Sequence, residues 1–310
     1  MEIVFDTNAY LAIVKDKSMD QVRKEFAAIT GTEEGTGFKV RMAPVPWMEL
    51  FCHLTDQTDP KFEDSMRAVV ASVIHSRRDF RTGQGNLVPQ WQMMVTNALF
   101  QHRDEALEKS LYSLDNLACV ISRTPNIPTV NINHSYLQGI RDFSEKKKYE
   151  FGENVKARQG EYHGFPKSQR DLIKRQFNKD DVYIMALNSI LVQAAQECNL
   201  KWEELDFDTW MAKLTLIAKY FPAPVFLIRG IISKVMGQKE FNIEKNHRKN
   251  WYWDYQMLFY ISSETTYILV TDDGAMKDAA KEAGVGDRVM GLNEYIKLLK
   301  LNIKTEYPDY

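Results

Sequence analysis

Apolar and polar positions near the N-terminus follow the alternation of strands and helices. Ile3-Val4-Phe5 has the pattern of a buried strand that ends at Asp6, and the two residues behind it are types that commonly begin helices. Residues 31–37 (GTEEGTG) have the composition of a loop, and residues 39–45 predict a second strand. A helix is expected to begin near Trp47. This end of the chain therefore predicts two strands, each followed by a helix.

The C-terminal end repeats this alternation. Residues 267–270 predict a strand, 271–274 a turn and 276–283 a helix. A short strand at 288–290 and an amphipathic helix at 293–299 complete the pattern. Strands that alternate with helices are typical of an α/β fold built around a parallel sheet.

The middle of the chain, residues 55–245, has a different pattern. Its apolar residues recur at helical spacing, as in Phe62, Met66, Val69 and Val73. Glycine and proline predict breaks near 83–89, 125–128, 160–166 and 222–224. We expect a mostly α-helical segment without a fixed repeat.

The amino-acid composition indicates the class of protein but says little about its function. The 310 residues are 44% hydrophobic and 26% charged with a net charge of -2, which is typical of a globular chain of two domains or of one domain with a large insertion. Neither a membrane span nor a secretion signal is visible, and three dispersed cysteines argue against a disulfide framework. The sequence predicts a cytoplasmic protein without a membrane partner.

Acidic residues follow the predicted strands or lie in the helices beside them. Asp6, Glu49, Asp254 and Asp273 have such positions, with Asp272 next to the last of them. The carboxyl ends of parallel strands form one edge of a sheet, so these acids are expected to converge there. Each acid, taken singly, is also explained as a helix N-cap or a turn residue.

Converging carboxylates need a cation. Two unit charges about 5 Å apart repel by roughly 3 kcal/mol at an effective dielectric constant near 20, so Mg²⁺ or Mn²⁺ is the expected cofactor. Such a site supports hydrolysis of a phosphodiester, in which metal-activated water is the nucleophile.

Four segments carry a resemblance to one family. VFDTNAYL contains Asp6, PWMELF contains Glu49, WDYQMLFYISSETTYILVTDDGAM contains Asp254, Thr271 and Asp273, and AGVGDRVMGLNEYIKLL follows. In this order the segments resemble the PIN-domain nucleases. The resemblance covers residues 1–54 and 246–310, whereas the 205 positions between the second and third acids far exceed a minimal PIN domain.

The resemblance implies a Rossmann-like α/β/α fold with a parallel sheet, interrupted by a mostly α-helical insertion domain at residues 55–245. It also implies a divalent-metal endonuclease that usually cuts RNA. Asp6, Glu49, Asp254 and Asp273 are the metal and catalytic residues that it predicts, with Asn8 and Thr271 in support. Asp272 is the alternative to Asp273 as the direct ligand. Asn8 and Thr271 are also ordinary capping residues.

Basic residues suggest where RNA binds. Residues 141–179 hold eleven Lys or Arg against six Asp or Glu, interleaved with aromatic residues that can stack on unpaired bases. The predicted contacts to single-stranded RNA are Lys146, Lys147, Lys148, Arg248, Lys249 and Trp251. A solvated helix face over core aromatics explains the same stretch.

Several alternatives stay open at this stage. A haloacid-dehalogenase-like phosphatase also has an Asp after its first strand, although it requires a second Asp where this chain has Asn8. A non-catalytic RNA-binding or assembly protein that kept the PIN fold is a third reading. The helical insertion is expected to select substrate, to bind a protein regulator or to form a homo-oligomer, and a toxin or phage-defence effector is a possible role. Cys52 and His53 are neighbours on a predicted helix, which argues against a catalytic dyad.

Overall fold

The structure is a computed structural model, and it describes residues 1–76, 87–123, 134–176, 179–236, 242, 248–263 and 265–307. Its strands are β1 (Glu2–Phe5), β2 (Lys39–Arg41), β3 (Tyr267–Val270) and β4 (Val289–Met290). All neighbouring strands pair in parallel in the order β2-β1-β3-β4. Within β1 and β3, Glu2 lies opposite Tyr267 and Phe5 opposite Val270, so the two ends of the chain form the centre of one sheet. The α/β class and the three strands predicted near 3–5, 267–270 and 288–290 are confirmed.

Helices cover both faces of this sheet because alternate strand residues point to opposite sides. Ile3 and Phe5 belong to one core and Val4 to the other. The first core is packed by α1 (Thr7–Val14), α2 (Met19–Thr36), α3 (Pro44–Cys52), α4 (Phe62–His75), α6 (Glu105–Ser122) and α14 (Leu292–Leu298). The second core is packed by α5 (Trp91–Phe100), α9 (Lys179–Glu197), α10 (Phe207–Tyr220), α11 (Pro222–Met236), α12 (Trp251–Met257) and α13 (Gly274–Glu282).

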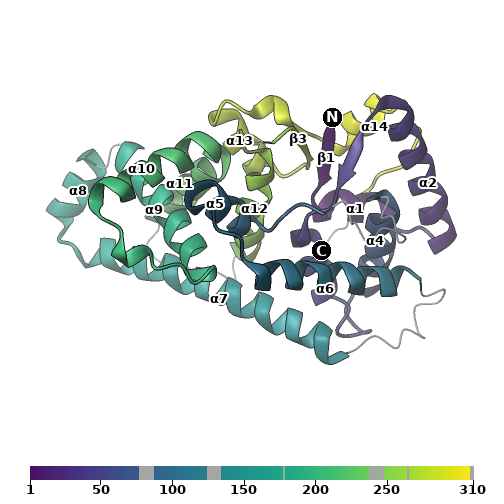
Figure 1. Cartoon of the computed structure of the whole chain (residues 1–310), viewed down its shortest axis with the longest axis horizontal. Coiled ribbons are helices and arrows are strands. Elements are labelled where there is room, and N and C mark those ends of the chain that lie inside the picture. Colours follow the sequence, from purple (N-terminus) through teal and green to yellow (C-terminus); the bar gives the residue numbers. More distant parts are fainter. Residues whose placement is uncertain are drawn as a thin grey trace.

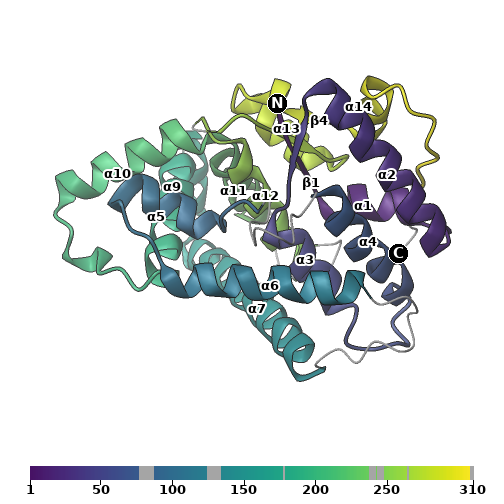
Figure 2. The ribbon, with the colours of Figure 1, turned by 45° about the vertical axis from the view of Figure 1, so that its right-hand side comes forward.

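The helices between residues 55 and 245 thus share both cores with the sheet. In Figure 1 the strands lie to the right of centre with α1, α2, α4 and α14 beyond them, while α8 (Lys167–Gln176) to α11 lie on the left. The long α7 (His134–Gly164) runs along the lower edge from the left group toward the right one. The turned view in Figure 2 keeps the two groups apart. Division of the chain into 1–54 with 246–310 and 55–245 stays a prediction.

The predicted loop at residues 31–37 is wrong. These residues form the last turns of α2, which begins with a capping box between Ser18 and Gln21 and ends at Gly37 with a positive φ of 75°. Glu33 within it is completely buried and accepts hydrogen bonds from Tyr295 and, at 2.7 Å, from His75. A buried polar anchor therefore outweighs the low helix propensity of the surrounding glycines.

Other predicted boundaries move by a few residues. The strand expected over 39–45 ends at Arg41, and the next helix begins at Pro44 rather than near Trp47, because proline is well suited to the first turn of a helix. α7 passes through Gly160 and ends at Gly164, while α11 begins at Pro222 as the breaks there predict. Of the break predicted at 83–89, residues 87–89 are described and are not helical, whereas 83–86 and the break at 125–128 lie outside the described residues.

The short helical turns complete the chain: Trp202–Glu204, Arg248–Asn250, Leu258–Ile261 and Gly286–Arg288. Within the described part of the chain, no single helix has the length and apolarity to cross a membrane. The pair α10 and α11 reaches them only together, with a bend of 102° between the two helices.

Candidate functional site

Asp6 stands where the central strands end. Its backbone N–H donates to the carbonyl of Val270 over 3.1 Å, so the ends of β1 and β3 are tied together. One carboxylate oxygen accepts the N–H of Ala9 at 2.7 Å and caps α1, and the other accepts the hydroxyl of Thr271. The capping role of Asp6 is therefore confirmed, and it leaves the side chain 3% exposed.

Thr271 links Asp6 to Asp273. Its buried hydroxyl oxygen also accepts the backbone N–H of Asp273 at 3.1 Å. Asp273 caps α13 by accepting the N–H of Met276 at 2.7 Å. Both acids at the strand ends thus combine a helix cap with a position beside Thr271.

Asp272 has other partners. One carboxylate oxygen pairs with Lys277 at 2.9 Å, and the other accepts the N–H of Leu292 at 3.2 Å and the hydroxyl of Tyr307. Burial would raise the pKa of Asp272, but these hydrogen bonds outweigh it and hold the pKa below the ordinary value. Its contacts tie the start of α14 to the end of β3, so they favour Asp273 over Asp272 as the acid that acts with Asp6.

Glu49 and Asp254 reach the same place from helices. Glu49 on α3 accepts the hydroxyl of Thr7, and Asp254 lies on α12. Burial raises the pKa of Glu49, opposed by the Thr7 hydrogen bond and by the nearby Lys148. The pKa of Asp254 is raised well above its ordinary value by burial and then by repulsion from Asp273, Glu49 and Asp6.

The pKa of Asp6 completes this picture of mutual repulsion. Burial and, to a smaller extent, the charges of Glu49 and Asp273 raise it from 3.8 to about 7 against the hydrogen bonds from Thr271 and Ala9. Asp6 and Asp254 thus feel the charges of other predicted acids. Three of the four acids, Asp6, Glu49 and Asp254, line one pocket, whereas Asp273 is not among its lining residues.

A pocket of about 250 Å³ lies over these acids. Asp6, Glu49 and Asp254 line it from three separate elements, and Asn8, another predicted residue, lies on its wall. Three cations also line it: Lys61, Arg141 and Lys148. The pocket therefore combines a cluster of carboxylates with a group of positive charges.

The predicted nucleic-acid contacts on α7 divide into different environments. Lys148 lines the acid pocket, 16% exposed and 3.2 Å from Glu145. Lys147 pairs with Glu197 at 3.1 Å, and Lys146 is 72% exposed. Successive helix residues point about 100° apart, so the three lysines do not share one surface.

The basic run before Asp254 is more buried than its composition indicates. Arg248 is 9% exposed and donates to the carbonyl of Asn242 at 3.0 Å, and its guanidinium carbon lies 5.8 Å from the centre of the Trp251 ring. The side chain of Lys249 lies outside the described residues. Contact of Arg248, Lys249 and Trp251 with nucleic acid stays a prediction.

Sequence reasoning missed some of the pocket. Lys61 and Asn250 line it without any local motif that marks them. Arg141 was missed as well, although it recurs with Glu145 and the predicted Lys148 at helical spacing on α7, which is a signal that the sequence does contain.

Cys52 and His53 both line the pocket without facing each other as a catalytic pair. The thiol donates to the carbonyl of Met48 at 3.0 Å, whereas Nδ1 of His53 contacts Asp59 at 3.0 Å. Burial raises the pKa of the Cys52 thiol, which disfavours a thiolate nucleophile.

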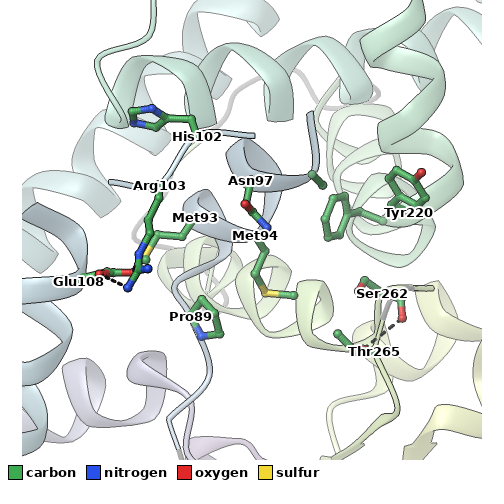
Figure 3. Close-up of a pocket in the computed structure, with 12 residues that line it drawn as sticks. Pro89, Met93, Met94, Asn97, His102, Arg103, Glu108, Tyr220, Ser262 and Thr265 are labelled. Carbon is green, nitrogen blue, oxygen red and sulfur yellow. Dashed lines mark hydrogen bonds and ion pairs between the residues drawn. The ribbon is translucent and has the colours of Figure 1, made fainter. Parts of the chain in front are cut away.

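A second hollow, of about 540 Å³, lies away from these acids (Figure 3). Figure 3 shows Met93 and Met94 between His102 and Arg103 on one side and Tyr220 on the other. Its one acid, Glu108, is bound by Arg103 with a nitrogen–oxygen distance of 2.9 Å. This hollow offers no cluster of reactive groups.

Comparisons of the chain with models of protein families, with curated proteins and with solved structures find no match. Function is therefore argued from the acid pocket itself.

Proposed function

We propose that this protein is a divalent-metal-dependent endoribonuclease that hydrolyses phosphodiester bonds in single-stranded RNA. The observation that carries the proposal is the convergence of Asp6, Glu49 and Asp254 on one pocket at the end of the parallel sheet. Ligands bind at this edge of open α/β sheets. The resemblance of the same residues to the PIN-domain nucleases supplies the choice of RNA.

The donor chemistry of the pocket fits Mg²⁺ or Mn²⁺. Carboxylate oxygens are the ligands that these hard cations prefer, and the raised pKa values of Asp6, Glu49 and Asp254 show that their charges are poorly compensated. Among the described residues, no three His, Cys, Asp or Glu side chains already have the spacing of a metal site. The fit thus rests on charge and donor type. Asp6, Glu49, Asp254 and Asp273 are the residues proposed to hold the cation, which would activate water and polarise the phosphodiester.

The positive side of the pocket gives it a place for the substrate. Lys61, Arg141 and Lys148 line it together with the carboxylates, which alone would repel a phosphate. Arg and Lys side chains bind phosphate oxygens through charge-assisted hydrogen bonds and position the backbone without reading sequence. The chain's own cations would hold the RNA backbone against the carboxylates.

Hydrogen bonds keep the carboxylates oriented. Thr271 donates to Asp6, and Thr7 donates to Glu49. Each threonine restricts the rotation of one carboxylate, so its remaining oxygen lone pairs are available to a ligand. This is the supporting role proposed for Thr271. Asn8, on the pocket wall, is proposed to contact substrate or solvent there.

Cleavage of labelled RNA and DNA tests the proposal. The protein should cut internal RNA linkages with Mn²⁺ or Mg²⁺ and stop in chelator. Asp254→Asn should lose cleavage by about a hundredfold or more, as removal of a metal-binding carboxylate does elsewhere. Asp272→Asn is the matched control. Asp272 is next to Asp273 in the sequence, but its carboxylate bonds to Lys277 and Leu292 instead.

Two outcomes would contradict the nuclease. If the parent protein in chelator and the Asp254→Asn variant both cut RNA as fast as the parent protein with metal, the carboxylates do not act through a cation. Rapid release of phosphate from small monoesters, with RNA left intact, would favour a phosphatase of the haloacid-dehalogenase type.

A further inference from the structure

An aromatic cavity of about 390 Å³ lies beside the acid pocket. It is enclosed by α3, α5, α6, α7 and α12. The aromatic residues of its wall are Trp91, Tyr136, Phe143, Tyr252, Trp253 and Tyr260. A cavity of this size with a mainly apolar wall and a few polar groups is typical of a small-molecule site.

Polar atoms of this wall are buried without partners. Among the described residues, the indole N–H groups of Trp91 and Trp253 and the amide oxygen of Gln92 have no hydrogen-bond partner. Trp91 is 1% exposed, Trp253 2% and Gln92 6%, so these atoms have little access to bulk solvent. The hydroxyl of Tyr260 is in the same state. A buried polar group without a partner costs about 1–3 kcal/mol, so several in one wall call for a ligand that satisfies them.

The amide of Gln92 is fixed in one orientation. Its nitrogen donates to Glu197, which also accepts from Lys147 at 3.1 Å and from Gln193 at 3.2 Å. The oxygen of Gln92 is therefore the end of the amide that remains to accept a hydrogen bond. The residues of the wall thus carry at least two donors and one acceptor without a partner.

An exposed glycine of α7 belongs to the cavity wall. Gly139 lines it between Tyr136 and Phe143, and no heavy atom lies within 4 Å of the place where its Cβ would be. Tyr136 is 37% exposed and Phe143 47% exposed. Glycine inside a helix is unfavourable by up to about 1 kcal/mol relative to alanine, and here it leaves a gap flanked by two aromatic rings.

We propose that this cavity binds a purine or pyrimidine base. A base is planar and stacks on aromatic rings, presents ring or carbonyl acceptors to the two indole N–H groups, and presents an N–H to the oxygen of Gln92. The lining contains no Lys or Arg, and its one charged residue is Glu197. A phosphate would therefore stay outside, and the volume suits a base with part of its sugar.

The position of the cavity relates the base to the acid pocket. On α7, Gly139 and Phe143 line the cavity whereas Arg141 and Lys148 line the acid pocket. Trp253, next to Asp254, lines both. A base in the cavity can come from a free nucleoside or from an unstacked nucleotide of RNA whose phosphate lies near Lys148; only the second source rests on the proposed nuclease function.

Binding in chelator separates the inference from catalysis. The whole protein is titrated with adenosine, guanosine, cytidine and uridine, with ribose 5-phosphate as the base-free probe, and heat is measured by calorimetry. A single-stranded oligoribonucleotide carrying one 2-aminopurine is titrated in parallel, and its fluorescence reports stacking. We expect at least one nucleoside or the labelled RNA to bind saturably. Ribose 5-phosphate, which lacks a base, should not bind in this cavity.

Two pairs of variants locate the bound base. Gly139→Leu closes the gap without a steric clash and should weaken base binding by about tenfold or more, whereas Gly160→Leu on the exposed face of the same helix should not change it. Trp91→Phe keeps an aromatic, though smaller, ring and removes the N–H, so it should weaken binding by roughly three- to tenfold. Trp210→Phe, the same change outside the cavity, is its control. Helix propensity favours leucine over glycine, so both glycine variants should fold.

The outcomes separate the two proposals. No binding of any nucleoside or of the labelled RNA up to roughly 10 mM, or binding that Gly139→Leu leaves unchanged, would overturn the base site even if RNA is cleaved. Binding that depends on Gly139 and Trp91 while RNA stays uncut would support the base site and count against the nuclease. Response to nucleosides alone identifies a free ligand, and response to labelled RNA alone identifies the substrate as its source.

Discussion

The charge of Asp6 should destabilise the metal-free protein above neutral pH. Its pKa of about 7 in the folded state, against an ordinary value of 3.8, means that folding favours the protonated form. Because the folded state holds the proton more tightly than the unfolded state, the free energy of unfolding should fall as pH rises from about 4 to about 7 and then stay level. Asp6→Asn removes this charge and should raise stability at pH 8.

The size of the effect follows from the two pKa values. Each unit of pH between them corresponds to about 1.4 kcal/mol, so the interval from 3.8 to about 7 sets an upper limit of about 4 kcal/mol at pH 8. At pH 5 the same reasoning leaves less than about 2 kcal/mol. Asparagine is as good an N-cap as aspartate, so the hydrogen bond from Ala9 is kept. A gain of about 2 kcal/mol corresponds to a rise in Tm of roughly 4–8 °C.

Thermal unfolding in chelator at pH 5 and pH 8 measures this effect. Asp206→Asn is the matched control, because Asp206 also caps a helix, by accepting the N–H of Thr209 at 2.7 Å, but hydrogen bonds lower its pKa. That change should lower the Tm at pH 8 or leave it unchanged. With Mn²⁺ at about 100 times its dissociation constant, the parent should gain about 2.7 kcal/mol and Asp6→Asn much less.

One result would refute the reasoning. If Asp6→Asn melts at or below the parent at pH 8 in chelator, burial and the neighbouring charges do not make the carboxylate of Asp6 unfavourable in the folded state. Asp6 would then be a helix cap alone, and the charge argument for a cation would fail with it.

Two further predictions concern residues outside the carboxylates. Lys148→Gln should weaken RNA binding in chelator and reduce the slope of log binding constant against log salt concentration by about 0.7. Lys146→Gln, a change exposed on another face of α7, should alter neither the affinity nor the slope. Equal effects of the two variants would mean that Lys148 does not contact phosphate. His75→Phe should lower the free energy of unfolding in urea by about 1–3 kcal/mol, because it leaves the buried Glu33 without one of its partners, while His102→Phe should have little effect; similar losses would show that the buried hydrogen bond contributes nothing.

The ends of the fold were predictable because their signals are local. The three apolar residues before Asp6 and the four before Thr271 each form a strand whose alternate residues are buried on opposite faces. Because the two strands pair in parallel, their carboxyl ends lie at one edge of the sheet. Asp6 and Asp273, which follow these strands, are both helix caps, so their capping role is confirmed, whereas their role at a metal stays a proposal.

The failures involve partners far away in the sequence. Residues 31–37 are helical because Glu33 is held by His75 and Tyr295, which are 42 and 262 positions away. No local propensity contains that information. The predicted RNA contacts at Lys146, Lys147 and Lys148 stay a prediction, and the structure adds that this run of like charges is spread around the axis of α7.

The position of α7 changes how the central helices relate to the proposed activity. The same helix supplies Arg141 and Lys148 to the acid pocket and Gly139 and Phe143 to the aromatic cavity. α3 does likewise with Glu49 on one side and Met48 on the other, and α3 packs against α7. Residues 55–245 therefore contribute side chains to the pocket that the acids form. Removing them would take away the cations of that pocket along with much of both cores, so any activity of this chain has to be sought in the whole protein.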